Sequence, residues 1–301
     1  NRDVMSIFPL ITELNTPWRW INSGAPKLGE WVLNCRIALM QGGVVDLLSC
    51  PEYMRWIQLT GNSQVDSQRQ TEIQYEIRNI NGDKDSLLVI GDSRNARSRH
   101  NFASTSRGID VVEPVDLGDV TRVAQDLDNQ NGEELANNLL DAVSSMMTGV
   151  GRAKVINRMP TILAGRNRTP ASPVELSVKE IIELGTRPSI ERLLNCLEES
   201  QDTRVFRREA FSALKRSVSL SISDCSKTIK QAAEVVREQR RHNGDRRIPT
   251  RAIGSTLLLK GLESDHSLIL DAGAMNPHHL YVALSRGAKT ITVFSNSSML
   301  P

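Results

Sequence analysis

The sequence predicts an α/β fold in which a parallel sheet flanked by helices is interrupted by an all-helical inserted subdomain. Short β-rich apolar runs alternate with helical patterns as far as Val112, and they resume at Ala252. Between these points apolar residues recur with the 3.6-residue period of helices. Strands that alternate with helices form parallel sheets with right-handed crossovers. The predicted domains are one discontinuous α/β domain, residues 1–115 and 248–301, and a helical insertion, residues 116–247.

The first part of the chain alternates between strand and helix patterns. A helix begins at Pro26, because apolar side chains follow it at helical spacing, and Gly42-Gly43 ends it. Apolar runs rich in β-formers then predict strands, and the polar stretches between them predict helices. The predicted strands are residues 54–59, 86–90 and 109–112, and the predicted helices are residues 64–79 and 95–107.

Five helices are predicted in the insertion from apolar residues that share one helical face. Their apolar positions lie within residues 135–147, 181–184, 190–197, 206–214 and 229–236. Residues 149–173 are basic and punctuated by Pro and Gly, so this stretch is predicted to be a connector.

The last part of the chain predicts a βαβ unit. Asn276 is placed to cap a helix that begins at Pro277, runs to Arg286 and is stopped by Gly287. The apolar runs around it are short and β-rich, as in strands buried on both faces. The predicted strands are residues 252–257, 267–270 and 290–294, with a turn at residues 260–261.

Composition excludes several classes of protein. The 301 residues carry a net charge of +2, so any nucleic-acid site must be a local patch. The four cysteines are scattered without metal-ligand spacing, which favours reduced thiols and predicts no metal site. No apolar run approaches the roughly 18 residues of a membrane span, and no signal peptide is visible, so we expect a cytoplasmic protein. The chain starts at Asn1 within a structured pattern, as a fragment of a longer protein would.

Two motifs in the last part, correctly ordered and spaced, resemble motifs V and VI of the UvrD/Rep-type superfamily 1 DNA helicases. They are Lys260-Gly261-Leu262-Glu263 and the run LYVALSRG that ends at Arg286-Gly287. The segment from Leu14 to Arg19 resembles motif IV, with Trp18 at the aromatic position. The helical insertion also stands where this family has one. The resemblance implies a RecA-like domain, and Leu257 and Ser264 depart from it, where the family usually has His and Phe.

The resemblance implies a role for each matching residue. Arg19 and Arg286 would be arginine fingers on the γ-phosphate, and Trp18 would stack on adenine. Glu263, beside Gly261, would accept a hydrogen bond from the ribose. The alternatives are a core tryptophan cluster for Trp18, a solvated turn for Lys260 and Glu263, and a helix-end cap for Arg286. The residues implied to lie near DNA are Ser255, Thr256 and Lys260.

A basic run near the end of the insertion has two interpretations. Its arginines could be a solvated helix end, where cations complement the macrodipole, or an edge that contacts nucleic-acid phosphates. No aromatic residue is interleaved for base stacking, which favours the first interpretation. The four candidate arginines are Arg240, Arg241, Arg246 and Arg247.

The chain lacks the G-x-x-x-x-G-K-[ST] loop and the acidic pair that hold phosphates and Mg²⁺ in this superfamily. We therefore expect the C-terminal half of an ATP-dependent, 3′-to-5′ DNA helicase or translocase, inactive alone. ATP with Mg²⁺ would bind against a Walker-bearing domain, and the other partner would be single-stranded or 3′-tailed DNA. A partner nuclease is compatible with the resemblance. The alternatives are a degenerate module that binds single-stranded DNA or a protein without turnover, and a purely structural scaffold.

Overall fold

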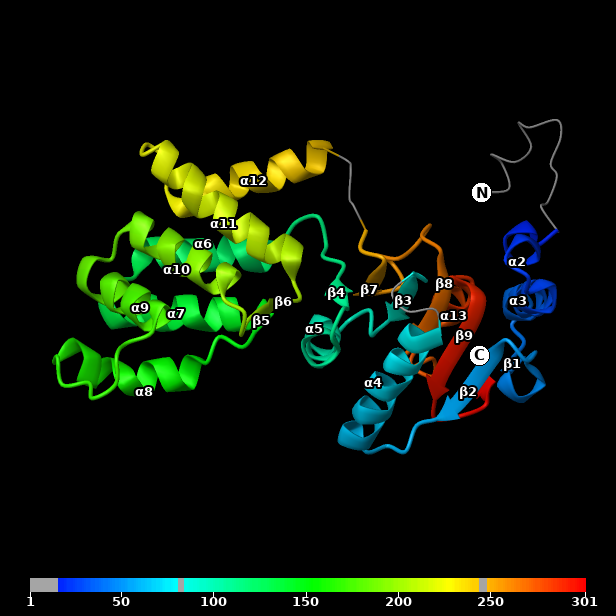
Figure 1. Ribbon diagram of the computed structural model, residues 1–301. Helices are drawn as coiled ribbons and strands as arrows, with labels where there is room; N and C mark the ends of the chain where they lie inside the picture. Colours follow the sequence, from blue (N-terminus) through cyan, green and yellow to red (C-terminus); the bar gives the residue numbers. More distant parts are fainter. Residues whose placement is uncertain (1–15, 81–83, 244–247) are drawn as a thin grey trace. The chain divides into compact units, whose positions relative to one another are not determined.

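A computed structural model of the chain describes residues 16–80, 84–243 and 248–301 (Figure 1). Its fold is α/β, as predicted, with a six-stranded parallel sheet of strand order β2-β9-β8-β3-β7-β4. The chain divides into two compact units. Unit 1 comprises Asn1–Arg94 and Ser255–Pro301, and unit 2 comprises Asn95–Gly254. Within the described ranges, no helix combines the length and apolar character that crossing a membrane requires.

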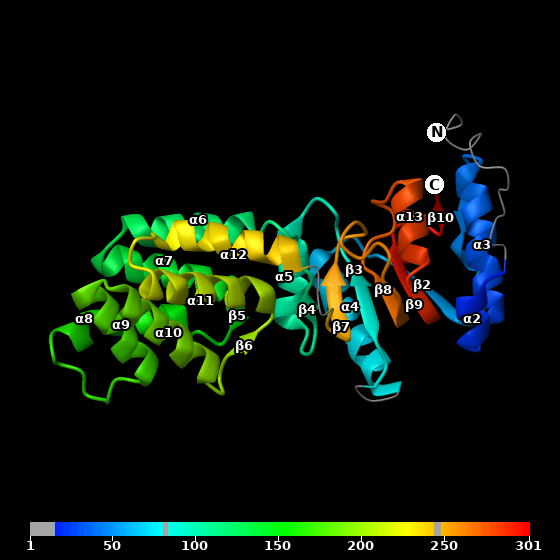
Figure 2. The same ribbon diagram turned by 90° about the horizontal axis from the view of Figure 1, so that it is seen from above.

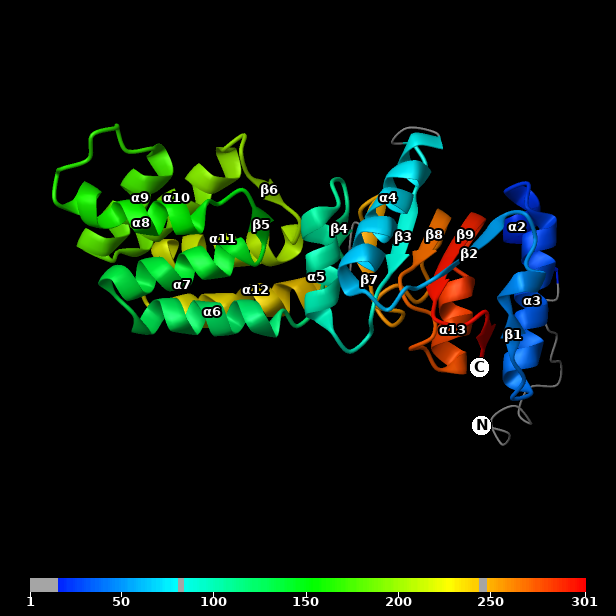
Figure 3. The ribbon, with the colours of Figure 1, turned by 90° about the horizontal axis from the view of Figure 1, so that it is seen from below.

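Unit 1 holds four strands of this sheet, β2, β9, β8 and β3. Strand β3 is a fully buried apolar run, whereas β2 buries only Met54 and Ile57. Helices α4 and α13 cover opposite faces of these strands (Figures 2 and 3). Helix α3 packs beside α13, and α2 packs on α3. The elements of unit 1 are α2 (Trp18–Asn22), α3 (Pro26–Met40), β1 (Val45–Asp46), a 3-10 turn (Leu47–Ser49), β2 (Met54–Gln58), α4 (Ser63–Ile80), β3 (Leu87–Ile90), β8 (Ser264–Ile269), α13 (Pro277–Leu284), β9 (Gly287–Ser295) and β10 (Met299–Leu300).

Unit 2 is mostly helical and has its own apolar core, formed by the inner faces of its helices. The helix pairs α11–α12, α9–α10 and α6–α12 pack against each other (Figure 3). Its elements are α5 (Ala96–Thr105), β4 (Asp110–Val111), α6 (Gly118–Asn129), α7 (Gly132–Ser144), β5 (Met147–Thr148), α8 (Arg152–Leu163), α9 (Pro173–Leu184), α10 (Arg187–Glu199), β6 (Arg204–Val205), α11 (Arg208–Ser223), α12 (Ile229–Asn243) and β7 (Arg251–Gly254).

Two features of unit 2 differ from the prediction. The expected connector, residues 149–173, contains helix α8, which buries Val155, Met159 and Ile162 at helical spacing. The helix was not predicted, because Pro160 inside it and the glycines on both sides indicate a connector instead. The insertion is also not purely helical, because β5 and β6 form a two-stranded antiparallel sheet. Strands of two residues are too short to leave a periodic signal.

The boundaries of unit 2 lie outside the predicted insertion of residues 116–247, and α5, β4 and β7 belong to it. Three arginines explain why, one in β6 and two at the start of α11. Arg204 donates to the carbonyls of Ala103 and Ser104 at the end of α5, at 3.0 and 2.8 Å. Arg207 binds Glu113 just after β4, and Arg208 binds Asp110 in β4. These long-range bonds attach α5 and β4 to the helices.

The last βαβ unit is present, with shifted ends. Strand β7 stops at Gly254, and α13 stops at Leu284, where Ser285 is the C-cap. Gly287 does not end the helix through a left-handed turn; it is the first residue of β9. A Cβ at this position would lie 2.8 Å from Ser267 Oγ and closer still to the carbonyl oxygen of Thr290. Glycine is therefore needed where β8 and β9 approach each other at an irregular point of their register.

Candidate functional site

Arg19, Glu263 and Arg286, predicted from three separate motifs, lie together in unit 1. Arg19 Nε is 2.6 Å from Glu263 Oε2, and Arg19 Nη1 donates to the carbonyl oxygen of Ser285 at 2.5 Å. Ser285 is the residue before Arg286. The fold thus brings helix α2, the turn before β8 and the end of α13 to one place.

Helix α2 is held in this position by its buried tryptophan. Trp20 donates from Nε1 to the carbonyl oxygen of Gly287 at 2.9 Å. Gly29 of α3 makes the contact possible, because a Cβ there would be 2.7 Å from Pro17 Cβ and 2.8 Å from Trp20 Cβ. The guanidinium of Arg19 lies over the Trp20 ring, 5.1 Å from its centroid. The anchoring of Trp20 therefore fixes where Arg19 can reach.

The guanidinium of Arg286 is buried, and its nitrogens donate hydrogen bonds to other groups of the protein. Its Nε donates to the Val282 carbonyl at 2.8 Å, and its Nη2 donates to Ser285 Oγ at 2.6 Å. Its Nη1 donates to the Leu262 carbonyl, with Leu259 O at 3.5 Å. Burial, and then the charge of Arg19, lower the pKa of Arg286. Arg286 therefore ties the segment before β8 to the end of α13.

The segment between β7 and β8 carries the other motif V residues. Ser255 and Thr256 are only 5% and 2% exposed. Their hydroxyls contact Leu258 N at 3.3 Å and Ser93 Oγ at 3.0 Å. Gly261 has φ +86°, a left-handed conformation that favours glycine. The buried hydroxyls of Ser255 and Thr256 therefore shape the segment rather than face solvent.

Three exposed side chains border this segment and the site. The side chain of Trp18 is 62% exposed, while Trp20 is buried and Trp31 is half-buried. Trp18 therefore stands apart from the core tryptophans and presents a free indole. Lys260 is exposed, and Leu257, at the position where the motif V family has His, is 74% exposed.

The basic residues predicted for nucleic acid belong to unit 2. Arg240 on α12 binds Glu209, and Arg241 binds Asp116 and, at 3.1 Å, Glu238. These two arginines are thus already neutralised by carboxylates of their own unit. Arg246 and Arg247 lie outside the described residues.

The sequence did not suggest a polar cluster at the amino ends of β3, β8 and β9. His266 is buried, with Nδ1 2.7 Å from Thr290 Oγ1 and Nε2 3.1 Å from Asp85 Oδ2. Lys289 Nζ lies 3.2 Å from Asp85 Oδ1 and 2.9 Å from Asp265 Oδ1. Burial raises the pKa of Asp265, but hydrogen bonds from Lys289 and Ser86 outweigh it and lower that pKa to about 2. These bonds satisfy both ring nitrogens of His266, so the cluster cross-links three strands.

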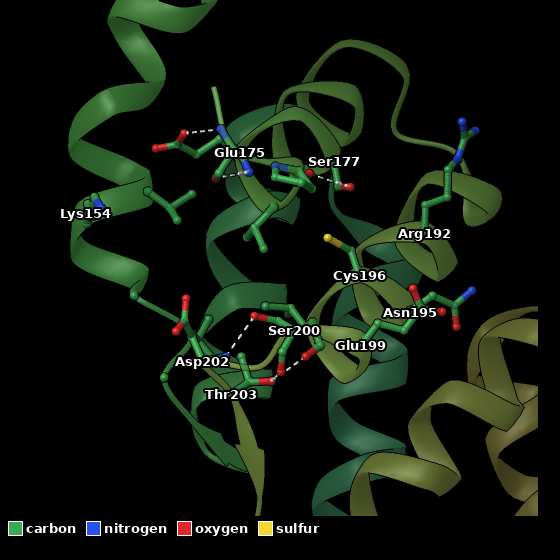
Figure 4. Close-up of a pocket in the computed structure, with 18 of the residues that line it drawn as sticks. Lys154, Glu175, Ser177, Arg192, Asn195, Cys196, Glu199, Ser200, Asp202 and Thr203 are labelled. Carbon is green, nitrogen blue, oxygen red and sulfur yellow. Dashed lines mark hydrogen bonds between the residues drawn. The ribbon is translucent and has the colours of Figure 1, made fainter. Parts of the chain in front are cut away.

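A groove of about 740 Å³ lies within unit 2 (Figure 4). It is lined by the first turns of α8 and α9, the second half of α10 and the turn that follows α10. None of the predicted site residues lines it. Its lining comes from segments with no shared sequence pattern, so no motif could have marked it.

Two further observations concern identity. In the part of the chain that the structure describes, no group of three or more His, Cys, Asp or Glu is arranged to hold a metal ion. In comparisons with known proteins, no family model and no curated protein matches the chain.

Proposed function

We propose that unit 1 is the second motor domain of a UvrD-like DNA helicase or translocase, which completes an ATP site together with a Walker-bearing domain. The observation that carries the proposal is the pairing of Arg19 with Glu263 beside Arg286. These residues were assigned separately, from motifs IV, V and VI, to one bound nucleotide. A shared nucleotide requires them to converge, whereas three chance resemblances do not.

Arg19 is the better of the two candidate arginine fingers. Its side chain is 32% exposed and that of Glu263 is 64% exposed. An exposed ion pair contributes only about 0–1 kcal/mol, so phosphate oxygens can replace the Glu263 carboxylate at small cost. Arginine suits this exchange because its planar fork bonds phosphate as well as carboxylate. Glu263 would then be released toward the ribose, and the exposed indole of Trp18 toward adenine.

Arg286 has a different role in this proposal. Its donors bind the carbonyls of Val282 and Leu262 and the Ser285 hydroxyl, so it positions the segment that carries Glu263. ATP with Mg²⁺ would receive its metal ligands and most phosphate contacts from the Walker-bearing domain. This sequence has neither the G-x-x-x-x-G-K-[ST] loop nor the acidic pair that supply these contacts. DNA would follow Lys260 and the backbone at Ser255 and Thr256. The 3′-to-5′ direction rests on the resemblance alone.

The test is calorimetric titration of the chain with ATP and Mg²⁺, followed by a hydrolysis assay with single-stranded DNA. We expect weak ATP binding that Arg19→Gln abolishes, and no hydrolysis. Lys27→Gln on neighbouring α3 is the control, because it removes an exposed positive charge that has no role in the proposed ATP site. Unchanged binding in Arg19→Gln, or DNA-stimulated hydrolysis by this chain at helicase rates, would contradict the proposal.

The second candidate is a degenerate module that binds single-stranded DNA or a protein without turnover. The occupied donors of Arg286, and Leu257 and Ser264 at the motif V positions of His and Phe, favour it. The two candidates differ in the coupling between ligands. In a motor half, ATP and the Walker-bearing domain change the affinity for DNA, whereas a degenerate module binds DNA with the same affinity in their presence.

A further inference from the structure

The groove in unit 2 has the size and the rigidity of a binding site. Its volume of about 740 Å³ lies within the roughly 300–1,000 Å³ of pockets that hold small ligands. It is open to solvent rather than enclosed. In Figure 4, the Cys196 sulfur points from its own helix toward the space between that helix and the helix that carries Lys154.

The walls of the groove are fixed by contacts of their own. Gly149 has φ +82°, and a Cβ there would lie 3.0 Å from Thr203 Cα and closer to the carbonyl oxygen of Asp202. Thr203 Oγ1 donates to the carbonyl oxygen of Leu197 at 2.5 Å. On the opposite wall, the amide of Ser172 donates to Glu175 Oε2 at 2.8 Å and closes a capping box at the start of α9. The site is therefore formed before any ligand arrives.

Charges in the groove are only partly balanced. Arg158 and Glu175 neutralise each other at 2.9 Å, and Arg192 binds Glu180 at 2.6 Å and extends away from the groove in Figure 4. Among the described residues, the remaining lining groups Lys154, Glu199 and Asp202 form no ion pair. Two carboxylates and one ammonium of the lining are thus left without an ion pair, so these unpaired groups together carry a net negative charge.

The position of Glu199 makes this charge unfavourable for the isolated protein. Glu199 is the last residue of α10, whose last turn has no basic residue. The C-terminal end of a helix carries partial negative charge, and a carboxylate there costs stability that a cation would restore. Its neighbour Glu198 has an internal partner, Lys215, whereas Glu199 has none among the described residues.

The rest of the lining is partly polar and partly aliphatic. Its aliphatic members are Val150, Val155, Pro173, Val174 and Leu197, of which only Pro173 and Val174 are not buried. Val155 and Leu197 belong to the apolar core of unit 2, so the floor of the groove is continuous with that core. The groove therefore fits a ligand with an aliphatic side chain beside a basic group.

We propose that this groove docks an extended segment of a partner protein, which places a Lys or Arg against Glu199 and Asp202 and an aliphatic side chain over Pro173 and Val174. Lys154 donates to a backbone carbonyl of the segment. The basic side chain supplies the missing cation at the C-terminal end of α10. The inference rests on unit 2 alone and is independent of the proposed motor function.

The test uses the whole chain and fluorescein-labelled, end-capped peptides in which Leu alternates with Arg or, as the comparison, with Glu. Binding is measured by fluorescence anisotropy. The groove variant is Glu199→Gln with Asp202→Asn. The matched control is Glu134→Gln with Asp126→Asn, which removes the same two charges from exposed positions elsewhere in unit 2. Circular dichroism verifies that both variants are folded, with the helical content of the natural chain.

We expect the Leu-Arg peptide to bind, its Kd to rise at least about tenfold in the groove variant, and the control to bind as the natural chain does. Alkylation by N-ethylmaleimide gives a second readout. The peptide should slow modification of Cys196, which lines the groove, but not of Cys225, which is exposed elsewhere.

Four results would overturn the proposal. They are equal weakening in the control, equal binding of the Leu-Glu peptide, no protection of Cys196, and no binding up to about 1 mM peptide. If the amide of N-acetyl-arginine protects Cys196 as well as the peptide does, the groove is a site for a small cation and not for a polypeptide segment.

Discussion

Arg19 in unit 1 and Arg207 in unit 2 both bind carboxylates, but in opposite surroundings. The Arg19–Glu263 pair is open to solvent, with side chains 32% and 64% exposed. The Arg207–Glu113 pair is buried, with side chains 4% and 2% exposed, and its bonds are 2.5 and 3.1 Å long. Burial raises the pKa of Glu113, and the bonds from Arg207 offset only part of that rise. An arginine–carboxylate pair is therefore open to exchange with other ions in unit 1, whereas in unit 2 it holds β4 against the helices.

The largest effect is expected from breaking the buried pair. Arg207→Met leaves Glu113 buried without its cation, and removing one partner of a buried ion pair costs about 3–5 kcal/mol. Urea denaturation followed by circular dichroism measures this loss. Arg19→Met is the matched change at the exposed pair, where about 1 kcal/mol or less is expected. Equal losses in the two variants would remove the contrast between the units.

Arg286 tests the comparison within unit 1. Arg286→Lys keeps the charge but cannot reproduce the bonds to Val282, Leu262 and Ser285. Leaving buried acceptors unsatisfied costs about 1–3 kcal/mol, so we expect a loss of that size in thermal or urea unfolding. Arg19→Lys should stay within about 1 kcal/mol of the natural chain. If Arg286→Lys is equally stable, its carbonyl contacts are not what holds the segment before β8.

The cluster around Asp265 predicts a smaller, pH-dependent effect. The pKa of Asp265 falls from 3.8 to about 2 on folding, so its contribution is complete above pH 4 and is lost as the pH falls through 2. Since the side chain is 31% exposed, we expect about 1 kcal/mol. Lys289→Met should flatten the unfolding free energy between pH 4 and 2, and Lys27→Met should not. An unchanged profile in Lys289→Met would exclude the Lys289 bond as the cause.

The smallest effect concerns the basic residues of α12. Arg240 and Arg241 are bound by Glu209, Asp116 and Glu238, so they have little to offer phosphates. Each phosphate contact on a single strand contributes about 0.7 to the slope of log affinity against log salt. Replacing both arginines by Ala should leave that slope unchanged in filter-binding titrations. A slope reduced by one or more would indicate that these two arginines do contact DNA phosphates.

The parts of the fold that depend on local pattern were predictable. The buried run Leu87–Ile90 became β3, and Asn276 caps α13 by accepting a hydrogen bond from the amide of His279 at 2.9 Å. Helix α8 was missed because Pro160 interrupts an otherwise helical pattern. The limits of unit 2 were missed because Arg204, Arg207 and Arg208 act on residues about a hundred positions earlier.

The residues of the candidate site were proposed one by one, without their arrangement. The resemblance to motifs IV, V and VI implied Arg19, Glu263 and Arg286 as contacts of one nucleotide, and that role stays a prediction. The resemblance could not indicate that Arg19 and Glu263 bind each other. Nor could it indicate that the guanidinium of Arg286 already donates to backbone carbonyls and to the Ser285 hydroxyl. Those contacts depend on how the segment after β7 folds back on α13, which is a tertiary property. The contacts of His266 with Thr290 and Asp85, which link strands β8, β9 and β3, could not be predicted from the sequence for the same reason.

At Gly287, one position of the motif resemblance has a separate, purely geometric cause. Any side chain at this position would collide with Ser267 and Thr290 where β8 and β9 converge. A library randomised at position 287 and selected only for folding should return glycine, whether or not the protein binds a nucleotide. Recurrence of this glycine among diverging sequences would then track a backbone constraint and not a shared activity. Recurrence of Arg19, whose side chain the fold does not require, is the more informative marker of common chemistry.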